Sequence, residues 1–489
     1  MKNSEELRQQ LCSINRKSYP AYKGLKGLYH FGNYILSIDH VQGDPFASPS
    51  HVSIQISHRD AGFPVEYYKD TLTGTTLCDY LTRQFEKQVS QYSFRAKGSG
   101  KSGLLTASHC GQEILSRTAC EITEKGITAR FFVGFPANGR TINATELEKI
   151  LFDFLPVCIQ KSFFYSSLNA KELQNYIELA EDQEFIRQTL PAKNLCAFIA
   201  DGSILPRESG ISSRPMKASV PFTSPDSLRI SINLPHKGKI TGMGIPKGIT
   251  LIVGGGYHGK STLLNALELG VYNHIPGDGR EYVITDATAV KLRSEDGRFI
   301  KDVDISMFIN DLPNKKDTRC FSTLDASGST SQAAGITESM EAGSHLFLLD
   351  EDTSATNFMV RDAFMQQVIQ REKEPITPFL ERAEDLYKKA GISTILVAGS
   401  SGAFFHIADT IIQMDNYVPK DITASVKKLC SQYPLPAVSV TDFQLPHSHR
   451  IMSRPAESSK RLRHNSRGNH SDSGAAKPER LKTRISGTD

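Results

Sequence analysis

Glycines, a lysine and hydroxyl residues follow one another at 254–262 with the spacing G-x-x-x-x-G-K-[ST], a pattern that binds nucleotide phosphates. Glycines let the backbone turn tightly enough to point N–H groups at phosphate oxygens, and a following helix adds its positive N-terminus. We predict that Lys260 reaches the terminal phosphates and that the Ser261 hydroxyl holds Mg²⁺. The complete run is Gly254, Gly255, Gly256, Tyr257, His258, Gly259, Lys260, Ser261 and Thr262.

This phosphate-binding loop lies between two elements that could position it. The apolar residues Ile249–Val253 predict a buried parallel strand before the loop, and residues 261–268 predict a helix after it. The alternative is a structural glycine-rich turn without a ligand. The order of strand, loop and helix favours phosphate binding over that alternative.

A second group of reactive side chains follows an apolar run at 346–349. The run predicts another buried strand, and it ends in Asp350 and Glu351. Asp350 could bind Mg²⁺ directly or through a water on the metal. Glu351 could polarise the water that attacks the γ-phosphate. Many parallel strands end in an acid, so these two residues alone do not identify a site.

The continuation from these acids is more specific. Residues 350–357 read DEDTSATN and resemble the D-E-P-T-S-A-L-D run of ABC-type ATPases. Asp352 replaces the proline of that run, and Asn357 replaces its final acid.

An ABC-type site also needs a signature helix upstream. Residues 326–332 (ASGSTSQ) resemble its L-S-G-G-Q sequence, and Gly328 lies 22 residues before Asp350. Hydroxyl residues and a glycine at a helix N-terminus can meet a γ-phosphate, whereas the alternative is an ordinary Ser/Gly loop that caps a helix. The resemblance implies that Ser327, Gly328 and Ser329 act in trans, on the nucleotide of a second copy.

Two other positions depart from the ABC pattern. A glutamine usually contacts the metal from a loop between these motifs, but residues 293–298 contain none, and Glu295 is the candidate replacement. A switch histidine usually follows the next buried strand, expected at 392–398, but residues 399–402 read GSSG. His406 comes later and is expected on a helix.

Several longer stretches together resemble the family of predicted ATPases of the ABC class. The resemblance covers roughly residues 1–443, and it implies an N-terminal domain of the family's own, ATP and Mg²⁺ as cofactors, and a soluble protein rather than a transporter. It also implies an ATP-dependent homodimer, and a link of one relative to RNA makes RNA the favoured nucleic-acid partner. The stretches are 39–50, 242–264, 277–281, 326–335, 350–362 and 374–378.

Composition indicates a globular protein without a membrane span. The chain has 489 residues with 39% apolar residues and no apolar run of about 18 residues. Its eight cysteines are scattered without a C-x-x-C pair, which argues against a zinc site or a disulfide framework and for a reducing compartment. No convincing signal or transit peptide precedes the first apolar stretch, so we expect a cytoplasmic protein, with the nucleus or an organelle left open.

We expect three regions. Residues 1–165 predict a smaller α/β domain, and residues 166–443 predict an α/β P-loop NTPase domain of ABC type, with a mixed sheet and helices. Residues 444–489 contain ten Lys or Arg and four Asp or Glu, and they predict a disordered basic tail. The tail is either a solvated end or an arm that binds nucleic-acid phosphates.

The sequence therefore predicts an ATP-binding and ATP-hydrolysing protein that acts on or with nucleic acid. One alternative is an ATP-gated RNA-binding or scaffold protein with little turnover. Another is a P-loop kinase, which has no need of the signature or of the run after Asp350. Residues 98–102 (GSGKS) resemble a second phosphate-binding loop, but Arg95 stands where the first glycine should be, so a flexible basic loop is favoured.

Overall fold

The N-terminal region is built on a mostly antiparallel sheet. The structure is a computed structural model, and it describes residues 1–361, 374–433 and 443–446. Among these residues the sheet has the strand order β1-β2-β3-β4-β8-β5, and β7 also pairs with β8. The strands are β1 (Lys2–Asn3), β2 (Gly27–His30), β3 (Ile35–His40), β4 (Ser50–Ile56), β5 (Leu105–Thr106), β7 (Cys120–Thr123) and β8 (Gly126–Val133).

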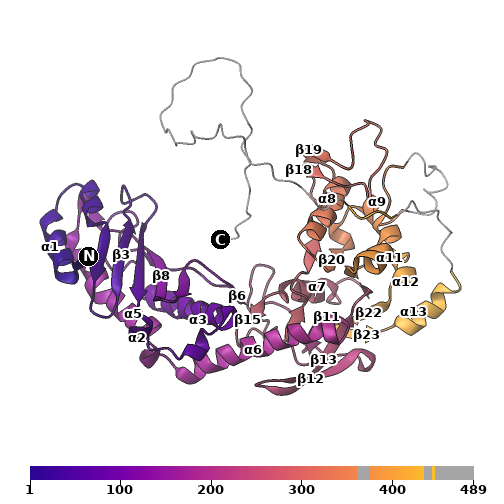
Figure 1. The fold of residues 1–489 in the computed structure, drawn as a ribbon, viewed down its shortest axis with the longest axis horizontal. Coiled ribbons are helices and arrows are strands. Elements are labelled where there is room, and N and C mark those ends of the chain that lie inside the picture. The colour runs from indigo at the N-terminus through magenta and orange to yellow at the C-terminus, as the bar shows by residue number, and fades with distance from the viewer. Residues whose placement is uncertain (362–373, 434–442, 447–489) are drawn as a thin grey trace, which may run out of the picture. The chain divides into compact units, whose positions relative to one another are not determined.

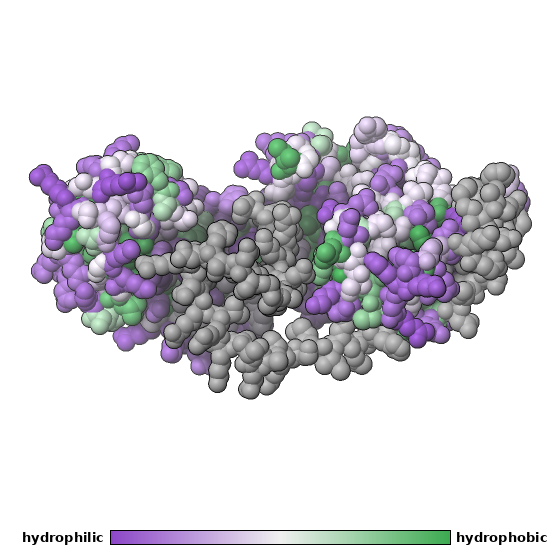
Figure 2. Space-filling view, turned by 90° about the horizontal axis from the view of Figure 1, so that it is seen from above, coloured by the Kyte–Doolittle hydropathy of each residue, from purple (hydrophilic) through white to green (hydrophobic). Residues whose placement is uncertain are grey.

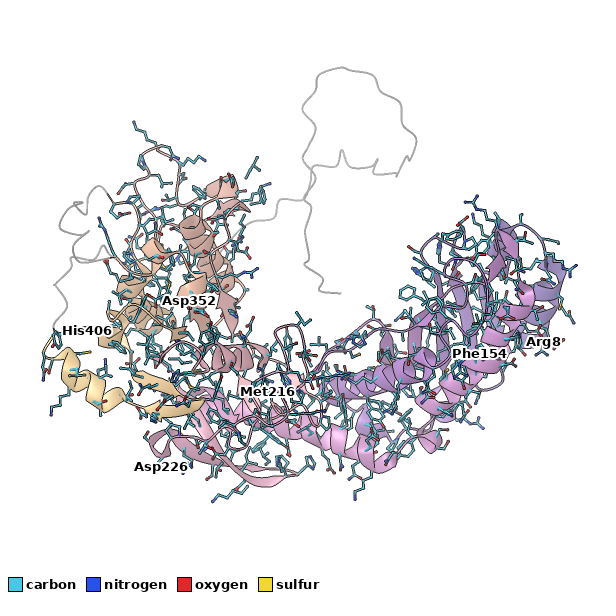
Figure 3. All side chains as sticks on the ribbon, turned by 180° about the vertical axis from the view of Figure 1, so that it is seen from behind. Arg8, Phe154, Met216, Asp226, Asp352 and His406 are labelled. Atoms are coloured by element: carbon cyan, nitrogen blue, oxygen red, sulfur yellow. The ribbon has the colours of Figure 1, made fainter. Side chains whose placement is uncertain are left out.

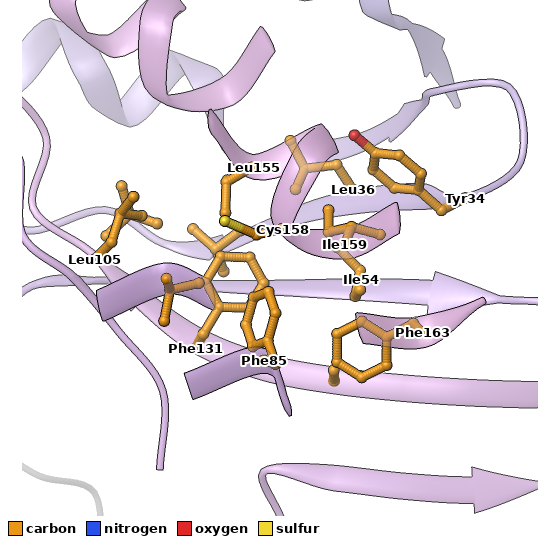
Figure 4. Packing of buried hydrophobic residues seen from close by; sticks show 14 of the residues in the cluster. Tyr34, Leu36, Ile54, Phe85, Leu105, Phe131, Leu155, Cys158, Ile159 and Phe163 are labelled. Carbon is orange, nitrogen blue, oxygen red and sulfur yellow. The ribbon is translucent and has the colours of Figure 1, made fainter. Parts of the chain in front are cut away.

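Helices of this region bury their apolar sides against the sheet. Phe85, Phe131 and Phe163 come from α3, β8 and α5, and the ring centroids of Phe131 and Phe163 each lie 5.1 Å from that of Phe85 (Figure 4). Such aromatic contacts contribute stability beyond the buried apolar area. The helices are α1 (Ser4–Ile14), α2 (His58–Ala61), α3 (Thr71–Ser90), α4 (Ala144–Glu148) and α5 (Leu155–Phe163).

Helix α6 (Ala170–Ala192) links this region to the following one (Figure 1). Near its start, the Tyr176 hydroxyl donates to the buried Asp79 of α3 over 2.8 Å. Further along, the Gln183 side chain donates to the carbonyl of His274 over 2.8 Å. A short antiparallel ladder between β6 (Glu113–Ile114) and β15 (Asn273–His274) adds a second connection.

An antiparallel sheet of the order β12-β13-β11-β16 follows α6. Residues 204–224 connect β11 to β12 without a helix or strand of their own, as their Pro, Ser and Gly content predicts. The strands are β11 (Leu195–Ala200), β12 (Arg229–Leu234), β13 (Gly238–Pro246) and β16 (Val283–Thr285).

The sheet that carries the predicted site is parallel except at one edge. Its order among the described residues is β17-β20-β21-β14-β22-β23, and only β22 and β23 pair antiparallel. The central strands are apolar and buried, as expected of a parallel sheet with both faces covered. The strands are β14 (Ile249–Val253), β17 (Val290–Leu292), β20 (Leu346–Asp350), β21 (Ser393–Val397), β22 (Thr410–Asp415) and β23 (Val418–Asp421).

Helices and a hairpin complete this region. The hairpin pairs β18 (Arg298–Val303) with β19 (Phe321–Ala326) and leads directly into α8. In the N-terminal region, a small antiparallel ladder joins β9 (Ala137–Asn138) to β10 (Thr141–Ile142). The helices are α7 (Lys260–Leu269), α8 (Gly328–Glu341), α9 (Thr356–Met359), α11 (Phe379–Ala390), α12 (Phe404–Ile407) and α13 (Thr423–Cys430).

Hydrophobic side chains on the face seen in Figure 2 form small patches separated by hydrophilic residues. Among the described helices, none combines the length and the apolar character needed to cross a membrane. The predicted tail at 444–489 lies outside the described residues except for 444–446.

Candidate functional site

The predicted phosphate-binding loop joins β14 to α7, and its geometry requires glycine at two positions. Gly254 has φ +141°, and a Cβ there would lie 2.4 Å from the carbonyl oxygen of Met414. Gly259 has φ +98°, and a Cβ there would lie 2.7 Å from Cδ1 of Tyr417. Side chains are strained in this part of φ space, so the backbone and its neighbours both exclude larger residues.

The loop leaves the N-terminus of α7 without a side-chain cap. A free helix N-terminus presents N–H groups and a partial positive charge to an anion. Lys260 turns back over the loop, and its Nζ donates to the carbonyl oxygens of Gly254 at 2.6 Å and Gly255 at 3.0 Å. Ser261 and Thr262 follow within the first turn of α7.

Asp350 lies at the carboxyl end of β20, two strands away from β14. Parallel strands end at the same edge, so the acid and the loop share the edge at which such sheets bind ligands. Burial raises the pKa of Asp350, while a hydrogen bond from the Asp352 N–H and the positive charges of Lys291 and Lys260 oppose the rise. Lys260 therefore acts electrostatically on the predicted metal ligand.

Glu351 is held by the loop that follows β21. Its Oε2 accepts from the N–H groups of Gly399 at 2.7 Å and Ser400 at 3.0 Å, and its Oε1 accepts from the Ser400 hydroxyl at 2.5 Å. Burial acts to raise the pKa of Glu351, but these hydrogen bonds outweigh it, so the pKa lies below its ordinary value. The carboxylate is thus ionised and already occupied by donors of the protein.

Ser400 and Gly399 occupy the place where the sequence lacks the expected histidine. Neither residue is predicted from the sequence to have a role in the site. The signal that could have found them is a Gly-Ser-Ser-Gly run directly after a buried parallel strand, since such a run offers several donors at the ligand-binding edge.

The signature segment caps α8. The Ser327 Oγ accepts from the Thr330 N–H at 3.5 Å, and the Ser329 Oγ donates to Asn357 at 2.7 Å. The Gln332 amide donates to the Ser354 hydroxyl at 3.0 Å and accepts from a backbone N–H of the same run. These bonds attach the signature helix to the residues that follow Glu351.

Gly328 is closely packed at the start of α8. A Cβ there would lie 3.2 Å from Oδ1 of Asp296. Within the described part of the chain, no hydrogen bond or ion pair joins residues 326–332 to the loop at 254–262. The signature and the phosphate-binding loop of one copy are therefore not joined by polar contacts in the described structure.

Glu295, the candidate metal-sensing residue, interacts with Arg293 and Ser331 in this structure. Its carboxylate pairs with Arg293 at 3.1 Å, and its N–H donates to the Ser331 hydroxyl of α8 at 2.8 Å. The segment is thus attached to the signature helix rather than to Ser261 or Asp350.

Three of the five backbone N–H groups of the second glycine-lysine loop, at 98–102, donate hydrogen bonds within the protein. The N–H groups of Ser99 and Lys101 donate to the carbonyls of Ala137 and Pro45, each at 2.8 Å. Because these amides are used within the N-terminal region, the loop is an ordered structural turn and not a second phosphate site.

Two family models match the chain in sequence. The model for the ABC ATPase P-loop domain matches residues 169–448, and the model for the N-terminal region of ATPases of the ABC class matches residues 4–166. The chain is also 31% identical over 266 residues to an uncharacterized protein, MJ1628, of Methanocaldococcus jannaschii. That match covers 52% of this chain and 58% of the relative, so the chain spans little more than half of the relative's length.

Solved structures give weaker similarities. The ADP conformation of MJ1267, an ATP-binding cassette of an ABC transporter, is 13% identical, with 40% of this chain and 88% of that chain covered and a TM-score of 0.26. The cbiO1 protein from Clostridium perfringens, part of the ABC transporter complex cbiONQ, is 13% identical, with 39% and 86% covered and a TM-score of 0.25. The family assignment depends on the two sequence models alone, which together span both regions. This chain belongs to the ATPases of the ABC class, a P-loop family that binds and hydrolyses ATP.

Proposed function

We propose that this chain binds ATP on the loop at 254–262 and hydrolyses it with Glu351 as the residue that polarises the attacking water. The observation that carries the proposal is the common edge at which the loop, Asp350 and Glu351 lie. The uncapped start of α7 and the Lys260 ammonium would stabilise the charge on the phosphates. Membership of an ATPase family argues against the alternative of a P-loop kinase.

The residues at this edge fit Mg²⁺. Ser261 and Asp350 offer a hydroxyl and a carboxylate, the oxygen ligands that Mg²⁺ prefers, and Mg²⁺ commonly takes one or two protein ligands together with phosphates and water. When bound, the ion would neutralise charge on the phosphates.

We further propose that the active form is a homodimer with ATP between the two copies. The signature residues Ser327, Gly328 and Ser329 lie at the start of α8 and make no hydrogen bond or ion pair with the loop of their own chain in the described structure. A second copy related by two-fold symmetry would place them over the phosphates, and one arrangement would create two equivalent sites. Nucleic acid, with RNA favoured, is the proposed effector, supported by the basic sequence of the tail.

ATP turnover by purified variants tests the hydrolysis. Lys260→Ala should lose ATP binding, and Glu351→Gln should bind ATP with little turnover. Lys388→Ala and Glu384→Gln are matched controls, since these residues pair with each other on the exposed side of α11 and should not change the rate. Normal turnover by Glu351→Gln would contradict the assignment of the water-activating residue.

The alternative of an ATP-gated binding protein with little turnover has one observation in its favour. The Glu351 carboxylate already accepts three hydrogen bonds and has a lowered pKa, which makes it a weaker base. In that case the wild type should bind ATP but turn it over no faster than Glu351→Gln, with or without RNA.

A further inference from the structure

Three exposed rings lie in a row across the N-terminal sheet, on the face opposite α3. In the strand register, His40 of β3 faces His51 of β4, and His51 faces Phe132 of β8. The ring centroids lie 5.4 Å apart between His40 and His51, and 5.1 Å apart between His51 and Phe132. The adjacent Phe131 points to the other face and packs against Phe85 of α3. We call His40, His51 and Phe132 the ring row.

A cavity of about 670 Å³ lies beside the ring row, and His51, Phe132, Arg130 and Asp39 are among its lining residues. Its volume falls within the range of about 300–1,000 Å³ that is usual for sites of small molecules. The Arg130 guanidinium is held by the Glu121 carboxylate at 2.8 Å and stays 45% exposed. The Asp39 carboxylate accepts from two serine hydroxyls of β3 and β4, at 2.6 and 2.7 Å. The cavity thus combines exposed rings with a fixed guanidinium, and both can stack on a planar base.

The loops at this end of the sheet are joined to one another. His40 ends β3 and His51 lies at the start of β4, so the loop between these strands begins and ends at the ring row. The Lys101 N–H donates to the carbonyl of Pro45 in this loop at 2.8 Å. The Gly139 N–H donates to the Ser99 hydroxyl at 2.9 Å, which attaches the turn at 139–140. The segment at 16–19 joins the same turn, because its last N–H donates to the carbonyl of residue 140 at 2.9 Å.

These joined loops carry several cations. Arg140 pairs with Asp44 at 2.8 Å. The other cations make no ion pair within the described part of the chain. Phe46, between the strands of the ring row, is 62% exposed. Unpaired cations beside exposed rings favour a partner that has both negative charges and planar groups. The unpaired cations are Arg16, Lys17, Lys97 and Lys101.

The segment that carries Lys97 and Lys101 is held in place before any partner binds. At its start, the Arg95 guanidinium lies over the Tyr92 ring, 4.8 Å from the centroid. Tyr92 in turn stacks on Phe154 (Figure 3), with the ring centroids 5.1 Å apart. Most backbone amides of the loop are used within the protein, so its contribution is the charge of the lysine side chains. A preformed loop loses little conformational freedom on binding, which favours affinity.

We propose that this end of the N-terminal region binds single-stranded nucleic acid, with bases stacked on the ring row and phosphates at the cations of the joined loops. The proposal rests on the proposed function, which names nucleic acid as the partner, and it assigns a contact to the N-terminal region in addition to the tail. Exposed rings favour a single strand over a duplex, whose bases stack on each other, and over an acidic protein, which offers charge without bases.

The test of the ring row measures the anisotropy of a labelled oligouridine of about 16 nucleotides, titrated with the full chain at several salt concentrations. Phe132→Leu keeps an apolar side chain but loses the ring. Its affinity should fall about tenfold, as expected for the loss of one aromatic stack, with the same slope of log affinity against log salt. Phe132→Tyr keeps the ring and should bind as the wild type does. Phe185→Leu, at an exposed phenylalanine of α6, is the control and should also bind as the wild type does.

The test of the cations measures the salt slope itself. The double variant Lys97→Ala and Lys101→Ala should reduce its magnitude by about 1.4, since each cation on a single strand contributes about 0.7. The matched control is Lys193→Ala with Lys239→Ala, at two exposed lysines outside the N-terminal region, and it should keep the wild-type slope.

Other probes identify the partner. An oligodeoxythymidine of the same length separates RNA from DNA, and tight binding of either strand supports the proposal. Equal affinity for a duplex, or for polyglutamate, would overturn the stacking of bases on the ring row. Wild-type affinity in Phe132→Leu, or a wild-type slope in the double lysine variant, would overturn this surface and leave the tail as the contact. A wild-type chain that binds no oligonucleotide at low salt would overturn the nucleic-acid partner itself.

Discussion

The hydrogen bond between the Ser400 hydroxyl and Glu351 can be removed without disturbing the backbone. In Ser400→Ala, Oε1 of Glu351 loses the donor that lies 2.5 Å away, while the two N–H donors to Oε2 remain. A hydrogen bond to a charged group stabilises by about 1.5–3 kcal/mol, and exposure to solvent reduces this one to about 1 kcal/mol. For a domain of this size, that loss lowers Tm by about 2–4 °C at pH 7.

The pH dependence of this loss distinguishes the bond from general disturbance. The pKa of Glu351 is lowered in the folded protein, so the stabilisation is present above the unfolded pKa of about 4.3. It is lost as the pH falls through the folded pKa, because protonation removes the charge that the donors stabilise. The Tm difference between wild type and Ser400→Ala should therefore be largest at pH 7 and smaller at pH 3.5.

Differential scanning calorimetry at the two pH values measures both Tm differences. Ser401→Ala is the matched control, because the Ser401 hydroxyl accepts from the Ala403 N–H at 3.4 Å and makes no hydrogen bond with Glu351. It should keep the wild-type dependence on pH. Equal Tm values for wild type and Ser400→Ala at pH 7, or a difference independent of pH, would refute the role of this bond.

Two further changes have clear expected outcomes. Gly259→Ala should lower Tm and weaken ATP binding, because its Cβ would lie 2.7 Å from Tyr417 at φ +98°; Gly256→Ala has no atom within 4 Å of its Cβ and should leave Tm unchanged. Deleting residues 448–489 should reduce the slope of log affinity for single-stranded RNA against log salt, since fewer cations then displace counterions. An unchanged salt slope in the truncated chain would show that the tail does not contribute to nucleic-acid binding.

Local features of the fold were predictable because short-range rules determine them. Asn3, Asn143 and Asn169 each begin a helix and accept from the N–H three residues on, at 2.8, 3.3 and 3.2 Å, as their spacing to a glutamate predicts. The strands β14 and β20 also follow from their apolar runs. These features depend on residues close together in the chain.

Contacts across the sequence were not predictable in the same way. Ser400 reaches Glu351 from 49 positions away, and its partner is fixed only when β20 and β21 pair. Tyr417 reaches Gly259 because β22 lies beside β14. The ladder between β6 and β15 joins two regions that no local pattern connects. Neither periodicity nor capping carries information on such pairings.

The dimerisation of Glu351→Gln in the presence of ATP tests most directly whether the ATP site is shared between two copies of the chain. This change removes water activation and keeps the phosphate contacts, so the ATP-bound state should persist. Multi-angle light scattering should give 54.0 kDa without nucleotide and twice that mass with ATP and Mg²⁺. Adding Ser327→Arg, which places bulk at the start of α8, should restore the monomer, whereas adding Ser13→Arg at an exposed position of α1 should not. A Glu351→Gln chain that stays monomeric in saturating ATP, or a dimer that tolerates Ser327→Arg, would contradict a site shared between two copies.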